Sequence, residues 1–456
     1  MAHACMRAAI VVAAGLAATL AASAETIFVS ADGGRLLQHV LDAAAPGDVV
    51  RLGPGEHRGP VVIGSALTLE GEPGAKLVGD ARGSVVAVTA AGAVVRGLQI
   101  SGSGTDIGTF DSGVFLGRTA TGALVENNDI AGNLYGVYIQ GAAGSIVRGN
   151  RIAGMSEGRT AQAGNGVHVW NAPGAQVIGN EISQGRDGIY TNASRDNVFS
   201  GNRFSDLRFA IHYMYTHDSV ISDNVSTGNS VGYAIMYSDR LAITGNVSDG
   251  DRDHGLLLNT AKNSTIEGNM VVGRMQPVSR WTNAGRRGDT HGVPMDASSQ
   301  AVAGDSRLGP EKCVFIYNAN RNGFSGNRFE NCAIGIHFTA GSEGNRMTGN
   351  AFVGNRNQVK YVGTRHLDWS AEGRGNYWSD NPAFDLDGDG IADAPYRPND
   401  LVDRVLWTAP QAKILINSPA VQVIRWAQSQ FPAILPGGVV DSRPLMLPPE
   451  PRIETR

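Results

Sequence analysis

Residues 201–224 read GNRFSDLRFAIHYMYTHDSVISDN, in which short alternations of apolar and polar residues lie between two asparagine turns. The second asparagine follows the first after about 22 residues, and most of the chain repeats this spacing. The asparagines at the repeated position are Asn128, Asn150, Asn180, Asn202, Asn224, Asn246, Asn269, Asn327 and Asn350. Short strands that alternate with turns at this period are typical of a solenoid. We therefore predict that each repeat forms one coil of a parallel β-solenoid.

A second repeated position lies about 14 residues before most of these asparagines and usually starts with glycine. It reads Gly136-Val-Tyr138, Gly166-Val-His168, Gly188-Ile-Tyr190, Ala210-Ile-His212, Gly255-Leu-Leu257 and Gly335-Ile-His337. Side chains alternate between the two faces of a strand, so the middle residue should point into the core and the third outward. The expected outward column is Tyr138, His168, Tyr190, His212, Met236, Leu257 and His337. We expect the asparagine amides to stack, each bonding the one above and below it.

The overall composition suits such a fold, because the 456 residues include 60 glycines and only 18% are charged. A solenoid grows along one axis, so this length does not require two or three separate cores. The formal charge is −4, and it becomes −5 without the N-terminal segment that contains Arg7. This balance argues against a general nucleic-acid binder.

The N-terminus, residues 1–24, reads as a secretory signal peptide. Arg7 provides a short basic start, residues 8–20 are apolar, and Ala22-Ser23-Ala24 forms a small-residue cleavage site. A buried N-terminal helix is the alternative. No later stretch reaches the roughly 18 apolar residues that cross a bilayer. We therefore expect an exported protein of the bacterial periplasm.

The rest of the chain divides into a solenoid over residues 25–375, with about 12 coils spaced about 4.8 Å apart, and a segment outside the repeat over residues 376–456. A polar insertion over residues 271–312 interrupts the solenoid, and a loop of this length is usually functional or disordered. An amphipathic helix that ends at Pro46-Gly47 is expected to cover the first coil; its apolar residues are Leu36, Leu37, Val40, Leu41 and Ala44. The predicted fold is an all-β parallel β-helix with an N-terminal capping helix and a separate C-terminal segment.

One strand is rich in soft metal ligands and reads His212-Tyr-Met214-Tyr-Thr-His217. His212 and Met214 share a face, and His217 lies just past the strand. Met236 is expected one coil above, close to His212 or Met214. Thioether and imidazole groups select Cu(I), so His212, Met214, His217 and Met236 are copper candidates. The alternative is a ladder of aromatic and histidine side chains that packs as any sheet surface does, with methionine as filler.

A charged tetrapeptide, Asp251-Arg-Asp-His254, occupies a turn in the next coil. Carboxylates and basic groups on one outer face of a β-helix can perform acid–base chemistry. A polysaccharide lyase or epimerase that acts on uronate polymers through Asp251, Asp253 and His254 is therefore an alternative function. The plainer interpretation is a turn with a salt bridge to Arg240 or Arg252.

Residues 385–393 place carboxylates at alternate positions and a glycine at the sixth position, which is calcium-loop spacing. The calcium candidates are Asp385, Asp387, Asp389 and Asp393. Tyr396 occupies the twelfth position, where a bidentate glutamate is expected. A turn rich in aspartate-to-backbone hydrogen bonds is the alternative.

Two cysteines, Cys313 and Cys332, remain after removal of the signal peptide and lie about one coil apart. An oxidising compartment favours a disulfide between them. Their unequal positions within the coil could make the Cα separation too long for that bond. Separate buried thiols and a metal-binding role are the alternatives.

The C-terminal segment contains a predicted helix that begins at Ser418-Pro419 and ends at Phe431-Pro432. One helix cannot bury all of the large apolar residues nearby, and a large exposed apolar patch usually marks an interface. We expect the segment to cap the last coil and to bind a partner. The expected contact residues are Trp407, Ile414, Val421, Trp426 and Phe431.

Several stretches outside the plain repeat carry a more specific signal: residues 311–318 (EKCVFIYN), 335–343 (GIHFTAGSE), 358–361 (QVKY), 375–380 (GNYWSD) and the tail 417–438. Together they resemble the NosD-type nitrous oxide reductase maturation proteins, and the resemblance covers nearly the whole mature chain. The segment around Cys313 and the tail are the most specific of these stretches.

The resemblance implies a right-handed β-helix in the periplasm that is not itself a catalyst. It also implies partners: an ABC permease and its ATPase, a small copper chaperone, and nitrous oxide reductase, whose copper centres the complex assembles. Membrane contact would occur only through the permease. The resemblance transfers no copper ligand, so the copper candidates rest on the residues alone. A scaffold that never contacts metal is a third interpretation.

Overall fold

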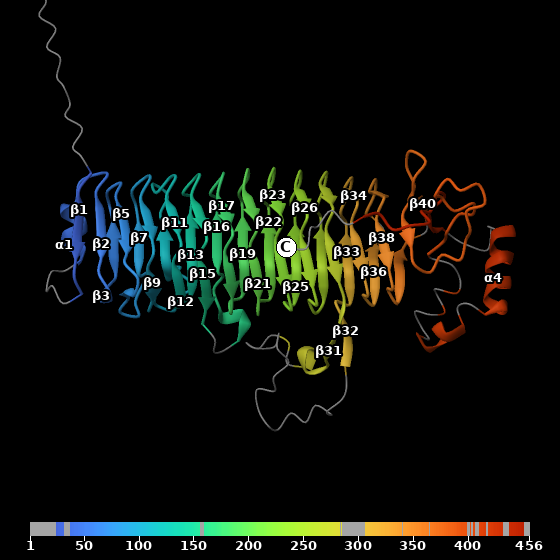
Figure 1. Ribbon diagram of the computed structural model, residues 1–456, viewed down its shortest axis with the longest axis horizontal. Coiled ribbons are helices and arrows are strands. Elements are labelled where there is room, and N and C mark those ends of the chain that lie inside the picture. Colours follow the sequence, from blue (N-terminus) through green and yellow to red (C-terminus); the bar gives the residue numbers. More distant parts are fainter. Residues whose placement is uncertain are drawn as a thin grey trace, which may run out of the picture.

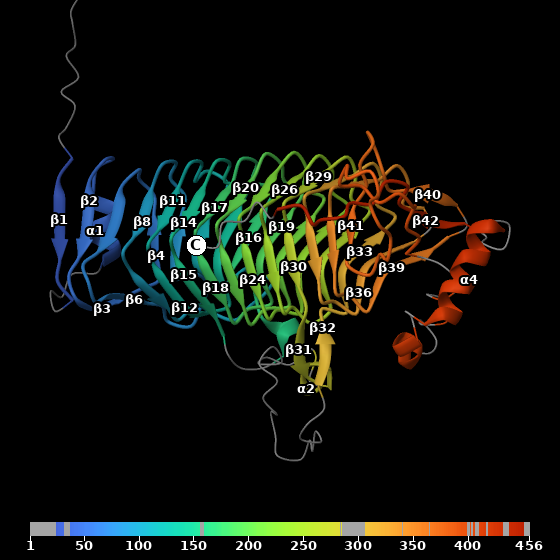
Figure 2. The same ribbon diagram turned by 45° about the vertical axis from the view of Figure 1, so that its right-hand side comes forward.

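The computed structural model describes residues 24–31, 37–155, 159–282, 284, 306–339, 341–363, 365–398, 402, 405, 410–415, 418–431 and 437–450. These residues form a long parallel β-solenoid, drawn lengthwise in Figure 1 and turned by 45° in Figure 2. Three parallel sheets with 13, 12 and 13 strands run along it, and each coil contributes one strand to each sheet. The predicted all-β parallel β-helix is confirmed. The proposed signal peptide, apart from Ala24, lies outside the described residues.

The first sheet contains β1 (Thr26–Val29), β2 (Val49–Leu52), β5 (Thr68–Gly71), β8 (Val94–Arg96), β11 (Leu124–Glu126), β14 (Ile146–Arg148), β17 (Gln176–Ile178), β20 (Val198–Ser200), β23 (Val220–Ser222), β26 (Ala242–Thr244), β29 (Thr265–Glu267), β34 (Gly323–Ser325) and β37 (Arg346–Thr348).

The second sheet contains β3 (Gly55–Arg58), β6 (Ala75–Val78), β9 (Gln99–Ser101), β12 (Asp129–Asn133), β15 (Arg151–Gly154), β18 (Glu181–Ser183), β21 (Arg203–Ser205), β24 (Val225–Thr227), β27 (Val247–Asp249), β30 (Met270–Val272), β35 (Arg328–Glu330), β38 (Ala351–Val353) and β41 (Tyr377–Trp378).

The third sheet contains β4 (Val61–Ile63), β7 (Val86–Val88), β10 (Ser112–Leu116), β13 (Tyr135–Gln140), β16 (Val167–Trp170), β19 (Asp187–Asn192), β22 (Phe209–Met214), β25 (Val231–Met236), β28 (His254–Asn259), β33 (Lys312–Tyr317), β36 (Ile334–Thr339) and β39 (Asn357–Val362).

The asparagine ladder lies at the turn between the first and second sheets and is buried throughout. At each rung the side-chain oxygen of one asparagine accepts the backbone N–H and the amide N–H of the asparagine one coil earlier. For Asn202 and Asn224 both distances are 3.0 Å. The Asn202 amide also donates to the Val177 carbonyl at 2.8 Å, which ties the turn to the core. The ladder begins at Asn128 and continues through every predicted member to one more, Asn376.

The far end of the ladder is closed by a carboxylate from the C-terminal segment. Asp441 is fully buried and accepts the backbone N–H of Asn376 at 2.7 Å and the indole N–H of Trp378 at 2.8 Å. The chain reaches this point through β42 (Gly438–Val440), which pairs with β40 (His366–Asp368). The regular pairing thus extends to Trp378, slightly beyond the predicted boundary at residue 375.

The first coil is covered by α1 (Leu37–Ala43), which buries Leu37, Val40 and Leu41 and packs beside β4. The predicted N-terminal capping helix is therefore present. Apolar columns fill the interior between the ends. In the first sheet, for example, Val177 pairs with Phe199 and Phe199 with Ile221, all fully buried.

Two excursions leave the coils on the same side of the solenoid (Figure 1). The smaller contains the short 3-10 helix η1 (Thr160–Gln162). The larger is the predicted insertion, whose described part contains β31 (Arg274–Pro277), α2 (Ser279–Thr282) and β32 (Ser306–Gly309). Strands β31 and β32 pair antiparallel. Since β30 and β33 belong to the sheets, the insertion is slightly shorter than the expected residues 271–312.

Beyond the last coil lie η3 (Pro410–Leu415) and α4 (Pro419–Gln430) (Figures 1 and 2). The α4 helix begins where predicted, because the Ser418 hydroxyl accepts the Val421 N–H at 3.4 Å and Pro419 occupies the first turn. Phe431 is its C-cap. No helix in the described ranges is long and apolar enough to span a bilayer.

The ladder predicts that replacing a ladder asparagine lowers the stability of the protein much more than replacing an asparagine outside the ladder. Asn202→Ala removes a rung. The Asn180 backbone N–H loses its acceptor, and the Asn180 amide keeps only the Val147 and Ile178 carbonyls. Each unpaired buried group costs about 1–3 kcal/mol. Asn259→Ala changes a half-buried outer-face side chain whose amide oxygen accepts a hydrogen bond from the adjacent Thr260 at 3.1 Å, and should cost well under 1 kcal/mol. Urea unfolding followed by circular dichroism compares the two; equal losses would contradict a stabilising ladder.

Candidate functional site

The two predicted methionine ligands are neighbours. Met214 ends β22 and Met236 ends β25, and the register pairs them directly across adjacent coils. Both side chains are half-buried on the outer face of the third sheet. Met236 was expected in the same column as His212, and that placement is wrong. Ala234 pairs with His212, so the methionine pair lies two residues further along the strands.

His212 lies on the same face of β22 as Met214 and is held by a buried carboxylate. Its Nδ1 atom is 3.1 Å from Oδ2 of Asp187, whose side chain is 1% exposed. Arg208 donates to both oxygens of the same carboxylate, at 2.8 and 2.6 Å. Burial alone would raise the pKa of Asp187, but the hydrogen bonds from His212 and Arg208 outweigh it and lower that pKa. Among the described residues nothing bonds the buried Nε2 atom of His212.

His217 lies past the end of β22, in the turn to the first sheet. Its Nδ1 atom is 2.5 Å from Oδ1 of Asp239 and 3.2 Å from the Asp239 backbone nitrogen. The Asp239 backbone N–H donates to Nδ1, and the carboxylate lies beside the same ring nitrogen. Both candidate histidines thus have a carboxylate near Nδ1. At His212 the carboxylate is hydrogen-bonded to Nδ1, as is common for metal-binding histidines.

Two tyrosines complete this corner and were missed by the sequence analysis. Tyr215 and Tyr237 follow the two methionines, and their rings stack with centroids 5.0 Å apart and planes 15° apart. They are 51% and 40% exposed. Both have positive φ, 48° and 50°, as do the residues at the same turn position of other coils, among them Ala193 and Thr260, so this backbone conformation belongs to the turn. The signal was present in the sequence, because Met-Tyr recurs after one coil at residues 214–215 and 236–237.

Four members of the predicted outward column, Tyr138, His168, Tyr190 and His212, form a stack of rings on the third sheet. Leu257 lies further along this column, and His337 contacts the Phe315 ring. Ring centroids of Tyr138 and His168 are 4.3 Å apart, those of His168 and Tyr190 are 4.7 Å apart, and those of Tyr190 and His212 are 5.0 Å apart. Burial lowers the pKa of His168 to about 3, so this imidazole is neutral at physiological pH. The ladder of aromatic and histidine side chains therefore exists and ends beside the methionine pair.

The charged tetrapeptide does not form an exposed acid–base site. Asp251 is fully buried and accepts hydrogen bonds from Ser226, Ser248 and the backbone N–H of Asn229. Arg252 pairs with Asp253 at 2.8 Å, whereas Arg240 pairs with Asp218 and Asp239. Since Asp251 cannot reach a polymer at the surface, the geometry favours the salt-bridged turn over a lyase or epimerase site.

The calcium candidates Asp385, Asp387 and Asp389 come together, with ligand oxygens within 4.8 Å of one another. They are the only such group of histidine, cysteine and acidic residues in the part of the chain that the structure describes. Asp393, the fourth calcium candidate, is not part of this group. Carboxylates of the loop also accept its backbone N–H groups: Asp385 accepts from Gly388 and Gly390, and Asp393 accepts from Leu386. Both the calcium site and the hydrogen-bonded turn fit this geometry, so calcium binding stays a prediction.

The sulfur atoms of Cys313 and Cys332 are bonded, and the two Cα atoms lie 5.6 Å apart. This separation is ordinary for a disulfide, although the two residues occupy different positions in their coils. Both side chains are fully buried in the core. A metal site at these cysteines is therefore not supported by the structure.

The apolar surface expected at the C-terminal end is present on η3 and α4. Ile414 is 91% exposed, Trp426 64% and Phe431 60%, whereas Val421 is half-buried. Val423, which the sequence analysis did not select, is 63% exposed. Trp407 lies outside the described residues.

Comparisons with known proteins agree with this fold and compartment. Residues 154–383 match the model of a family described as "Periplasmic copper-binding protein (NosD)". A "Probable ABC transporter binding protein NosD" of Pseudomonas aeruginosa is 43% identical over 403 residues, covering 88% of this chain and 89% of that protein. A protein of the same description from Stutzerimonas stutzeri is 42% identical over 405 residues, covering 89% and 88%.

Among solved structures, the Dettilon tailspike protein gives a TM-score of 0.51 at 17% identity, over 72% of this chain and 63% of that one. At this identity the likeness concerns the fold alone. The protein is thus a periplasmic parallel β-helix of a family described as copper-binding. It belongs to the NosD family.

The methionine pair predicts how copper affinity should respond to substitution. Met214→Leu with Met236→Leu keeps the volume but removes both sulfur donors, so Cu(I) affinity should fall at least about tenfold while circular dichroism stays unchanged. Competition with a Cu(I) chelator measures the affinity. Met275→Leu, in the insertion and 63% exposed, is the control. A loss confined to the control would move the site to the insertion, where His291 and Met295 lie outside the described residues.

Asp251 predicts a pH dependence of stability. Burial raises its pKa to about 7 in the folded protein, although hydrogen bonds from the two serines and from Asn229 lower it. The unfolded carboxyl titrates near its ordinary value of about 3.9. Between these two pKa values the carboxyl is protonated in the folded state and ionised in the unfolded state. The free energy of unfolding therefore falls as pH rises, by up to about 1.4 kcal/mol per pH unit. Urea midpoints from pH 4.5 to 8 should show a smaller decline for Asp251→Asn; parallel profiles would contradict the assignment.

Proposed function

We propose that this protein is the periplasmic component of an ABC-type complex that assembles the copper centres of nitrous oxide reductase. In this role it binds Cu(I) transiently at the corner formed by Met214, Met236 and His212. One observation carries the proposal: adjacent coils of a protein from a copper-binding family bring two methionines into register, and an imidazole with an unbonded nitrogen lies two residues earlier on the same face of β22.

The donor set at this corner suits Cu(I). Thioether and imidazole are soft or borderline donors, and they select Cu(I) over hard cations that prefer oxygen ligands. The Asp187 and Arg208 pair orients His212, and Asp239 orients His217. The methionines are half-buried and the tyrosines exposed, so a metal bound at this corner would be accessible from the surface. A surface site suits transfer between proteins, because a small copper chaperone could reach it without unfolding either partner.

The C-terminal surface supports a second part of the proposal, the contact with the complex. Hydrophobic side chains on α4 and η3 point to solvent, and the aromatic ones resemble the anchors that dominate protein interfaces. The relatives are described as ABC transporter binding proteins. We infer that this surface contacts the periplasmic side of the permease, whose ATPase lies across the membrane. Membrane contact would then occur only through the permease.

Deletion of the entire C-terminal segment is a poor test of this contact. It would remove Asp441, Val439 and Leu445, which are buried against the last coils. Residues 438–445 thus contribute to the closure of the last coil that was expected of this segment. Point substitutions on α4 leave this closure intact.

Val423→Ser with Trp426→Ala should weaken co-purification with the permease from detergent-solubilised membranes. Loss of an aromatic anchor costs about 2 kcal/mol, roughly thirtyfold in affinity. Because both side chains are mostly exposed, the melting temperature should stay unchanged. Val62→Ser, at the opposite end of the solenoid and 46% exposed, is the control. Undiminished co-purification of the double variant would place the contact on the flank of the solenoid.

A further inference from the structure

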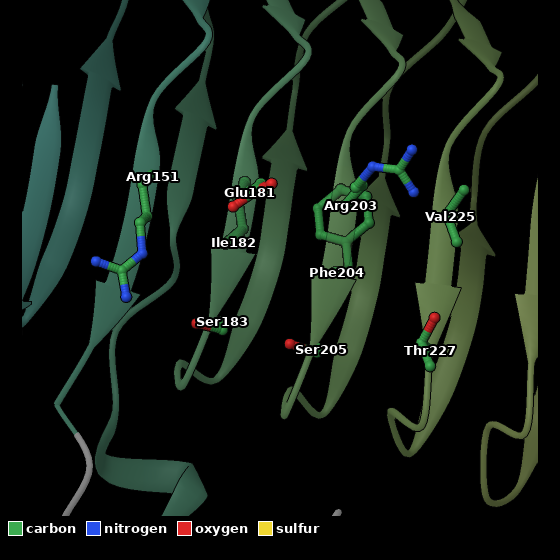
Figure 3. Close-up of a pocket in the computed structure, with 9 residues that line it drawn as sticks. All are labelled: Arg151, Glu181, Ile182, Ser183, Arg203, Phe204, Ser205, Val225 and Thr227. Carbon is green, nitrogen blue, oxygen red and sulfur yellow. The ribbon is translucent and has the colours of Figure 1, made fainter. Parts of the chain in front are cut away.

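A hollow of about 230 Å³ lies on the outer face of the second sheet, across β15, β18, β21 and β24 (Figure 3). It lies on a different face from the methionine pair, which belongs to the third sheet. The polar side chains that line it are Arg151, Glu181, Ser183, Arg203, Ser205 and Thr227.

Two parallel columns of side chains form this hollow. In the strand register, Arg151 lies opposite Glu181, and Glu181 lies opposite Arg203. The sign of the charge therefore alternates from coil to coil. Beside them Ser183 pairs with Ser205, and Ser205 with Thr227. Coils are spaced by about 4.8 Å, so the backbones of the two arginines, two coils apart, are separated by about 10 Å. Figure 3 shows the two guanidinium groups extending away from each other, on either side of Glu181.

Elsewhere on the outer surface, comparable charges neutralise one another. On the first sheet Glu70 accepts from Arg51 and Arg96, both at 2.6 Å. On the second sheet Arg328 pairs with Glu330 at 2.6 Å. In the hollow, Arg151 makes a contact of 3.4 Å with the Asp129 carboxylate. Within the described ranges, no ion pair involves Glu181 or Arg203, and no protein group bonds the hydroxyls of Ser183, Ser205 and Thr227. The hollow therefore offers regularly spaced donors and acceptors to a ligand.

The chemistry of the hollow fits a saccharide better than a peptide. Strands β15, β18, β21 and β24 are paired on both sides within the sheet, so no backbone edge is open to an added peptide strand. The outward side chains offer hydroxyls and charges, and Val225 is the one aliphatic group among them. A glycan repeats hydroxyls at a spacing close to that of the coils. Carboxylates two units apart could meet Arg151 and Arg203, while Glu181 would accept hydroxyls from the unit between.

We propose that this hollow binds a linear glycan that carries a carboxylate on every second sugar unit. The site is independent of the copper corner and of the C-terminal surface. Glu181 sets the specificity, because it repels a polymer that carries a carboxylate on each unit. The two arginines provide affinity, and the hydroxyl column fixes the register of the chain.

Isothermal titration with three hexasaccharides tests the proposal. A hyaluronan hexasaccharide, which alternates glucuronate and N-acetylglucosamine, should bind best. Hexagalacturonate, with a carboxylate on each unit, and neutral chitohexaose should each bind at least tenfold more weakly. Glu181→Gln should improve hexagalacturonate binding. Arg203→Gln should weaken hyaluronan binding at least tenfold, whereas Arg328→Gln, on the same sheet but outside the hollow, should not.

Several results would overturn the glycan site: no hyaluronan binding by the native protein at millimolar concentration, equal binding of all three sugars, or equal effects of the two arginine substitutions. Tighter binding of an acidic peptide such as a repeated Asp-Ser sequence would also overturn it, in favour of a protein partner. Melting temperatures confirm that each variant is folded before titration.

Discussion

The buried asparagine ladder is the interaction on which the rest of the structure depends. Each rung satisfies a backbone N–H and an amide N–H from the previous coil and also bonds a core carbonyl, as Asn202 does with Val177. A buried turn without these bonds would leave several polar groups unpaired at every coil. The ladder therefore fixes the turn between the first two sheets at the same place in each coil, and the register of all three sheets follows.

Because the register of the strands is fixed, residues at equivalent positions of successive coils lie side by side on the surface. Because each coil advances by one strand spacing, Met214 meets Met236, Tyr215 stacks on Tyr237, and His217 meets Asp239. No single coil contains this set of groups. Insertions leave the arrangement undisturbed because they emerge at turns, where the hairpin of β31 and β32 projects from the side while β30 and β35 remain paired. The solenoid thus provides a rigid frame for sites at its corners and ends.

The periodic parts of the structure were predictable, and the long-range parts were not. Alternation and the Asn spacing identified the coils, and Ser418-Pro419 identified the start of α4, because these signals are local. Met236 was placed in the wrong column. The repeated three-residue position of its coil starts at Gly232, so the third residue of that position, Ala234, lies beside His212. Asp441 closes the ladder from 65 residues beyond Asn376, and nothing periodic marks it. The Asp187 bond to His212 also joins residues one coil apart whose types do not repeat.

X-ray absorption spectroscopy of the Cu(I)-loaded protein tests the central claim most directly, because it reports the atoms bound to the metal. The account predicts two sulfur neighbours and at least one imidazole nitrogen at copper, with both sulfur contributions lost in the Met214→Leu/Met236→Leu variant. A spectrum with only nitrogen and oxygen neighbours would contradict it. A sulfur signal that persists unchanged in the variant would equally place copper away from this corner.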